Sequence, residues 1–147
     1  CFIVRDQAQG QSEAEIEHTI GVGLLNADNQ WERAEKHFKK AVELDPKLDR
    51  AWYNLGLIYI DSEEGMGYFR KAIEVNPGYS PAYYWIAYYY TRYGKFKEAL
   101  PILEDYLRIA KAGTADEEAG RIQTAEAVIE EIKSGKLGKE LSMIYIK

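Results

Sequence analysis

The chain has 147 residues, which is enough for one domain with a modest hydrophobic core. Its 46% hydrophobic and 29% charged residues are typical of a globular protein, and a net charge of -5 without a basic stripe makes nucleic acid a poor candidate for a partner. No run of about 18 apolar residues is present to span a membrane, and a single cysteine excludes an internal disulfide and a cysteine-based zinc site.

The N-terminal segment, residues 1–11, is expected to be extended and begins with Cys1. A mature chain that begins with cysteine resembles a bacterial lipoprotein after removal of its signal peptide, in which this cysteine carries the lipid. The apolar Phe2–Val4 is not the polar tether usual in lipoproteins. Two alternatives therefore stay open: a lipid on Cys1 in an exported or cell-envelope protein, or an arbitrary boundary in a cytoplasmic one.

The first helix is expected to begin at Ser12, because Glu15 three residues later completes a capping box. Its apolar face is expected to contain Ile16, Ile20 and Leu24. After a turn at residues 26–29, a second helix is predicted over 30–44. One stripe of that helix holds apolar residues at spacings of three and four, namely Trp31, Ala34, Phe38 and Ala41. Asp45-Pro46 should end it.

The middle of the chain predicts three more helices, over residues 50–60, 63–75 and 81–93, with Ser62 and Ser80 as caps. Gly94 should stop the last of them. A helix over 96–111 contains Pro101, which should kink it or disturb its first turns.

The C-terminal part of the chain predicts a last helix over 115–133, started by a capping box of Thr114 and Glu117. One face of this helix is apolar and the other is charged, as expected of a helix that caps a stack. Residues 134–147 are expected to be a linker and an apolar tail, with Leu141–Ile146 as the apolar part.

An internal repeat links the middle segments. Residues 38–53 read FKKAVELDPKLDRAWY, and residues 69–84, 31 positions later, read FRKAIEVNPGYSPAYY. Seven of the sixteen aligned positions are identical. A period in the low thirties, with helices broken by Asp-Pro or Asn-Pro, indicates stacked helix pairs, which present binding surfaces and rarely catalyse reactions.

The repeat resembles the tetratricopeptide repeat family. The residues that carry the resemblance in the middle repeat are Trp52, Leu55, Gly56, Tyr59, Gly65, Phe69, Ala72 and Pro77. The resemblance implies an all-α helix-turn-helix solenoid of about seven helices over 12–133. Its repeats are about 12–46, 50–77 and 81–112, with a capping helix over 114–133. Large residues of each first helix should pack on small residues of the second. The middle repeat is short between Tyr59 and Gly65, so its turn should be tight, and Tyr106 replaces a small residue of the family pattern.

The resemblance also implies a concave groove lined by the first helix of each pair. Helical spacing then places a set of mostly apolar and aromatic residues there. These are Tyr53, Leu57, Ile60, Tyr84, Tyr88 and Arg92, preceded by His18, Val22 and Leu25. The alternative is that individual tyrosines are buried between repeats. Members of the family that grip a C-terminal carboxylate use Lys and Asn on this face, so we do not expect that specificity here.

The sequence leaves two alternative functions open. The first is a non-enzymatic scaffold that binds a protein or peptide segment in the groove, without a cofactor, with Arg92 and Asn54 setting the polar register. The second is a subunit that assembles with its own copies through the apolar segments Phe2–Val4 and Met143–Ile146. The two histidines, His18 and His37, have no metal-ligand spacing.

Overall fold

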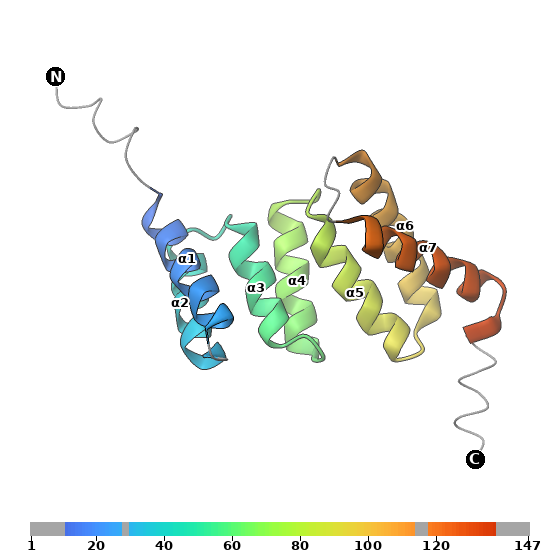
Figure 1. Cartoon of the computed structure of the whole chain (residues 1–147), viewed down its shortest axis with the longest axis horizontal. Helices are drawn as coiled ribbons and strands as arrows, with labels where there is room; N and C mark the ends of the chain where they lie inside the picture. The colour runs from blue at the N-terminus through green and yellow to red at the C-terminus, as the bar shows by residue number, and fades with distance from the viewer. Residues whose placement is uncertain (1–10, 28–29, 114–117, 138–147) are drawn as a thin grey trace, which may run out of the picture. The chain divides into compact units, whose positions relative to one another are not determined.

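The computed structural model describes residues 11–27, 30–113 and 118–137, and this part of the chain consists of helices without strands. The expected all-α helical repeat fold is thereby confirmed. The helices, as drawn in Figure 1, are α1 (Glu13–Asn26), α2 (Trp31–Leu44), α3 (Asp49–Ile58), α4 (Glu63–Val75), α5 (Ser80–Arg92), α6 (Phe96–Ala112) and α7 (Ala119–Lys133). Cys1, Phe2–Val4, the Thr114–Glu117 capping box and Leu141–Ile146 lie outside the described residues.

The chain divides into two compact units, one up to Pro77 and one from Gly78. In the first unit α1 pairs with α2, α3 pairs with α4, and α2 also contacts α3. In the second unit α5 pairs with α6, and α6 contacts α7. Each unit has its own core, the first around Phe38 and Leu55 and the second around Leu103 and Tyr106.

The helix pairs of the first unit are held close by glycines that face phenylalanine rings. A Cβ on Gly21 would lie 2.6 Å from the Phe38 ring, and one on Gly56 would lie 2.5 Å from the Phe69 ring. Both rings are fully buried. At these two contacts the small residue belongs to the first helix and the large one to the second, so the expected direction of packing was wrong. The reason is that glycine removes the side chain which would otherwise hold the backbones apart.

The turn of the middle repeat is as tight as its short length predicts. A Cβ on Gly65 would lie 2.0 Å from the Tyr59 carbonyl oxygen. That oxygen accepts hydrogen bonds from the Ser62 amide at 3.0 Å and the Ser62 hydroxyl at 2.8 Å. The Ser62 hydroxyl in turn accepts from the Gly65 amide at 3.0 Å, and this caps α4 as predicted. Ser62 therefore ties the end of α3 to the start of α4.

Two further predicted helix ends are confirmed, and one predicted cap is not. Ser12 and Glu15 form the capping box of α1, and Gly94, with a φ of 70°, follows the end of α5. The prediction for Ser80 was wrong, because it is the first residue of α5 and not its cap. Its hydroxyl donates to the Glu118 carboxylate at 3.5 Å instead, so a tertiary contact replaces the local one.

The apolar face predicted for α1 was wrong at two of its three residues, because only Leu24 packs against the core. Ile16 and Ile20 are 46% and 42% exposed, whereas Ala14, His18 and Gly21 are buried. The Phe38 ring occupies the space against Gly21, and the His18 ring lies 5.7 Å from it, so this face of α1 is the one turned toward α2. In α2 the stripe of Ala34, Phe38 and Ala41 is fully buried, but Trp31 in the first turn is 49% exposed. A prediction based on hydrophobicity alone therefore assigned Ile16 and Ile20 to the wrong face of α1.

The helix α6 runs from Phe96 to Ala112 with Pro101 inside it, so its first turns are formed, and a kink at this proline remains a prediction. Pro101 lies within the first two turns and is exposed, so its ring is directed away from the core. No helix in the described ranges is both long and apolar enough to cross a membrane.

Candidate functional site

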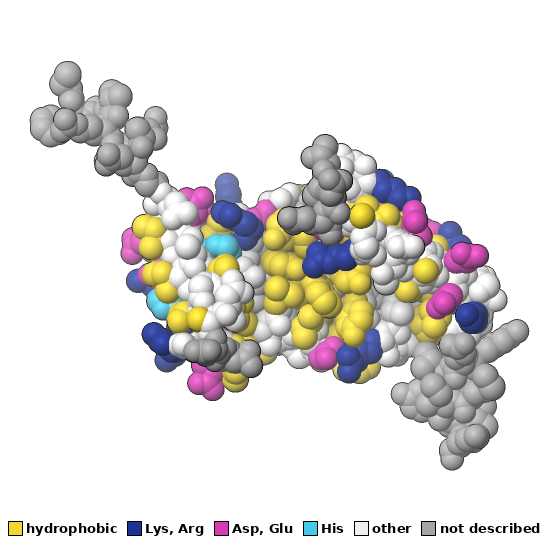
Figure 2. Space-filling model, viewed as in Figure 1, with side chains coloured by type: hydrophobic (Ala, Val, Ile, Leu, Met, Phe, Trp, Pro, Cys, Tyr) yellow, Lys and Arg dark blue, Asp and Glu magenta, His cyan; other side chains and the backbone are white. Residues whose placement is uncertain are grey.

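The aromatic helix α5 carries the candidate site. Its inward side is small or apolar, with Ala82, Ile86, Ala87 and Tyr89 buried. On its other side Tyr88 is 40% exposed, and Tyr84 and Trp85 are half-buried. Figure 2 shows hydrophobic side chains gathered over α5 on the viewed face of the molecule. Part of the aromatic surface of α5 is therefore accessible to solvent.

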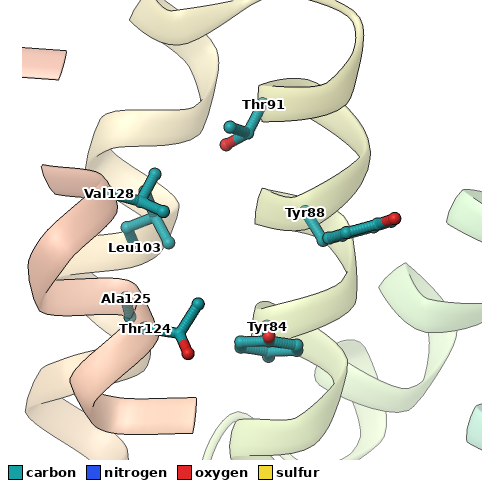
Figure 3. A pocket seen from close by; sticks show the side chains of 7 residues that line it. All are labelled: Tyr84, Tyr88, Thr91, Leu103, Thr124, Ala125 and Val128. Atoms are coloured by element: carbon teal, nitrogen blue, oxygen red, sulfur yellow. The ribbon is translucent and has the colours of Figure 1, made fainter. Parts of the chain in front are cut away.

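A small apolar pocket opens beside these tyrosines, within the second unit. It has a volume of about 50 Å³ and is bordered by α5, α6 and α7 (Figure 3). Its lining residues are Tyr84, Tyr88, Thr91, Leu103, Thr124, Ala125 and Val128. Leu103 and Ala125 belong to the core of the unit, so the pocket reaches down to the core from the surface of α5.

Thr91 contributes an unusual polar group to this pocket. Its hydroxyl oxygen is buried, and it has no hydrogen-bond partner among the described residues. In a helix a threonine hydroxyl often donates to the carbonyl four residues earlier, as Thr124 does to the Gly120 carbonyl at 2.9 Å. A buried hydroxyl without a partner costs about 1–3 kcal/mol. The described part of the protein therefore carries an unsatisfied hydroxyl that is buried beneath the apolar lining of the pocket.

Arginines contact both tyrosines of the pocket. The Arg121 guanidinium lies over the Tyr84 ring, 5.5 Å from its centroid, and Arg92 donates to the Tyr88 hydroxyl at 3.3 Å. The Trp85 ring meets both tyrosine rings edge-on, at centroid distances of 5.4 and 5.5 Å. These contacts orient the aromatic side chains of α5.

Tyr106 of α6 lies beneath the aromatic side chains of α5 and contacts the ring of Tyr84. Its ring is fully buried, 5.4 Å from that of Tyr84, and its hydroxyl donates to Glu118 at 2.5 Å. Burial, and then the bond to the Glu118 carboxylate, raise the pKa of Tyr106 far above its usual value. The phenol therefore stays neutral and acts as a structural donor that ties the start of α7 to α6.

Comparison of the chain with known protein families identifies its family. Models of the tetratricopeptide repeat match residues 24–61, 49–79 and 68–100, and together they cover residues 24–100, more than half of the chain. The chain is a tetratricopeptide repeat protein. The match over residues 49–79 spans α3 and α4, and the division into three repeats with α7 as a capping helix remains a prediction.

A solved structure supports the same fold for this tetratricopeptide repeat protein. It is similar to the crystal structure of the Sgt2 TPR domain from Aspergillus fumigatus, with a TM-score of 0.66 and 20% sequence identity over 86% of this chain and 85% of that one. At this identity the likeness concerns the fold. No curated protein sequence matches the chain significantly.

The remaining predicted groove residues of the tetratricopeptide repeat protein lie in its first unit. Tyr53 and Leu57 are half-buried on α3, and the Tyr53 ring lies 5.7 Å from that of Phe69. Ile60 is also half-buried, but it follows the end of α3 at Ile58 and so lies in the turn and not on the helical face. A binding role for these three residues remains a prediction.

Asn54 and His18 bond to each other in the tetratricopeptide repeat protein. His18 was expected to face the groove, but it is only 9% exposed, and its Nε2 lies 2.8 Å from the Asn54 amide nitrogen. Because that nitrogen can only donate, Nε2 is the acceptor and the ring is neutral. The pair links α1 to α3, so the expected role of Asn54 in ligand register has no support from this contact.

We expect His18 to make stability depend on pH. Burial, and then the positive charge of Arg50, lower the pKa of His18 below its usual value, although Asp49 and Glu15 oppose the shift. The unfolded chain therefore binds the proton more readily than the folded one. The free energy of unfolding should be constant above about pH 6.5 and fall as the pH decreases below it.

Urea unfolding at pH 7.5 and 5.5 checks this expectation. The wild type should lose more stability between the two values than His18→Gln, in which the titrating ring is absent. Both proteins keep His37 and Glu17, whose nitrogen and carboxylate lie 2.6 Å apart, so this second histidine is matched between them. Equal losses would contradict the assignment.

Four pocket residues, Leu103, Thr124, Ala125 and Val128, were not predicted from the sequence as part of a site. Ala125 and Val128 belong to the last helix, for which only an apolar face was predicted, and their position near Tyr84 depends on how α7 packs. Thr91 carries no signal in the sequence, since its unpaired hydroxyl depends on side-chain orientation in the folded protein.

Proposed function

We propose that this tetratricopeptide repeat protein is a non-enzymatic interaction module, and that its second unit binds a peptide segment of another protein over the α5–α7 pocket. The observation that carries the proposal is the open apolar pocket beside the exposed ring of Tyr88. Binding of protein or peptide partners is the general role of tetratricopeptide repeats, which supports the class of function. The peptide specificity is our inference from the pocket.

The side chains at the pocket suit a peptide ligand. Tyrosine and arginine are the residue types most enriched among energetically dominant interface residues, and Tyr88 and Arg92 bond to each other on α5. The pocket offers a place for one ligand side chain, and the Tyr88 ring, which points away from Leu103 and Val128 in Figure 3, offers a separate apolar surface on α5. Contact between a peptide and Tyr88 would cover apolar area at little conformational cost, because Trp85 and Arg92 already orient the ring.

We expect Tyr88→Ala to weaken peptide binding at least tenfold while the protein stays folded, because the ring is exposed and its loss leaves no core cavity. A displayed library of random twelve-residue peptides selects ligands of the wild type, and calorimetric titration measures their affinity for each variant. Tyr93→Ala is the matched control, since Tyr93 follows the same helix and is 53% exposed, but does not line the pocket.

Three results would count against the proposal. They are a library with no enriched peptide, equal affinity of the wild type and Tyr88→Ala for the enriched peptides, and an equal loss of affinity in Tyr93→Ala. Circular dichroism of each variant checks that the helices are intact. Tyr53→Ala in the same titration measures whether the first unit contributes to binding.

Self-association is a second candidate function, favoured by the exposed Ile16 and Ile20 on α1. These residues lie one turn apart, so they form an apolar strip that a second copy of α1 would cover. We expect the particle mass from light scattering to rise from 16.9 kDa toward twice that value with concentration. A joint Ile16→Glu and Ile20→Glu variant should stay monomeric, whereas Leu44→Glu, an equally exposed position on α2, should not differ from the wild type. A constant monomer mass for the wild type would exclude this function.

A further inference from the structure

We propose that the apolar segment Leu141–Ile146 binds, within its own chain, to a groove between the start of α6 and the end of α7. The groove is separate from the α5–α7 pocket, so this inference goes beyond the proposed function and does not depend on it. Three observations carry it: the size and lining of the groove, the place where the chain leaves α7, and the composition of residues 141–146.

The groove is large enough to hold several side chains. Its volume is about 580 Å³, compared with about 50 Å³ for the α5–α7 pocket, and lies in the range of about 300–1,000 Å³ that is usual for ligand sites. Phe96, Leu100 and Ile132 give it an apolar lining, and each of them is only half-buried. The remaining lining residues are Gly94, Lys95, Lys97 and Glu98, of which the charged ones are exposed. The groove therefore suits an apolar segment with polar groups at its edges.

The chain that follows α7 begins beside this groove. Ile132 lies in the last turn of α7. The Gly135 amide donates to the Ile132 carbonyl at 3.1 Å, and Gly135 has a φ of 74°, so the backbone changes direction directly after the helix. Leu141 follows Ile132 by nine residues, which can span up to about 30 Å. Phe96 to Leu100 covers only about 6 Å of α6, so the segment can reach every part of the groove.

The composition of the segment favours its burial. Residues 141–146 read LSMIYI, so every side chain except that of Ser142 is apolar or aromatic. Burial of such side chains is favourable in proportion to the apolar area removed from water. The half-buried apolar lining of the groove gains in the same way, because the segment would cover it.

The short tether favours the chain's own groove over the groove of a second copy. A segment joined to its binding site by a short linker has an effective concentration in the millimolar range. A second copy in a micromolar solution supplies its groove at roughly a thousandth of this concentration. The contact within one chain therefore predominates even at modest intrinsic affinity.

Disulfide formation between the segment and the groove tests the inference in the full chain. Cys1→Ser removes the natural thiol, Lys97→Cys places a thiol at the edge of the groove, and Ser142→Cys places one in the segment. Lys97 is exposed, and serine and cysteine are similar in size, so the fold should be kept. A disulfide requires Cα atoms within about 7 Å of each other. With oxidised glutathione as the oxidant and micromolar protein, we expect rapid closure within one chain, followed by electrophoresis without reducing agent.

Charged substitutions in the segment make the test specific. Met143→Glu combined with Ile144→Glu in the same double-cysteine chain should slow closure at least tenfold, because the segment would have to take charges out of water. Both thiols and the length of the tether are unchanged, so a segment that does not bind the groove would close at the same rate. Leu100→Glu should slow closure to a similar extent from the side of the groove, with circular dichroism to check that the helices are intact.

A thiol elsewhere on α6 provides the positional control. Arg108 is exposed on the same helix and lies about 16 Å further along it than Lys97. Arg108→Cys in place of Lys97→Cys should therefore react with the thiol of the segment at least tenfold more slowly.

Four results would overturn the inference. They are equal closure rates with and without the two glutamates, equal rates for the Lys97→Cys and Arg108→Cys chains, an unchanged rate in a folded Leu100→Glu variant, and a disulfide that joins two chains. The last result would assign the groove to the segment of a second copy. None of them bears on peptide binding by the second unit, which the Tyr88→Ala titration tests separately.

Discussion

Gly65→Ala should lower the free energy of unfolding by about 3 kcal/mol or more. The added Cβ would lie 2.0 Å from the Tyr59 carbonyl oxygen and 2.7 Å from its carbon, distances that real contacts do not reach. Both neighbouring atoms are backbone, so no side chain can rotate to make room. The turn would have to open, and this would disturb the Ser62 hydrogen bonds that join α3 to α4. Urea unfolding followed by circular dichroism measures the loss.

Gly67→Ala provides the control for this prediction, because it makes the same chemical change two residues further along α4. Nothing lies within 4 Å of the position of its Cβ. Alanine favours a helix over glycine, so this variant should be more stable than the wild type by about 0.5–1 kcal/mol. The two variants should therefore change stability in opposite directions. A Gly65→Ala protein as stable as the wild type would show that the turn is not rigid.

Tyr106→Ala should destabilise the protein by about 3–5 kcal/mol, although alanine restores the small residue that the family pattern has at this position. The ring is fully buried and lies against Tyr84, and its hydroxyl holds Glu118 at the start of α7. A small residue would leave a cavity between α5 and α6. Thermal and urea unfolding measure the effect.

Two further variants divide this effect into its parts. Tyr106→Phe keeps the ring but leaves the Glu118 carboxylate with its 3.5 Å bond from Ser80 and its 3.7 Å contact with Arg121, so it should cost about 1–2 kcal/mol. Tyr88→Ala removes the same kind of side chain from an exposed position, and its cost should stay below 1 kcal/mol. A loss below about 1.5 kcal/mol for Tyr106→Ala would mean that the unit repacks around a smaller residue.

The sequence was sufficient to predict the repeat, because the 31-residue period and the residues that begin and end helices can be read directly from the chain. The spacing of Ser12 and Glu15 predicted a capping box, and the short interval before Gly65 predicted a tight turn, as observed. The face of α1 was not predicted correctly. Ile16 and Ile20 are more hydrophobic than Ala14 and Gly21, but a large ring on α2 requires small residues opposite it.

The candidate site was predicted in part for a similar reason. Tyr84 and Tyr88 follow from helical spacing, because both belong to one helix. The residues that complete the pocket come from α6 and α7, and their approach to α5 is a matter of tertiary packing. Whether the Thr91 hydroxyl finds a hydrogen-bond partner depends on the side-chain torsion angle, which cannot be predicted from a sequence pattern.

The pairing of helices with their sequence neighbours has a consequence for the kinetics of folding. The main contacts within the two units join consecutive helices, α1 with α2, α3 with α4, and α5 with α6. Contacts between residues near in sequence close short loops, so their formation costs little chain entropy and is fast. On the ribosome, each pair can therefore form as soon as its second helix has emerged, and the order of synthesis becomes the order of folding.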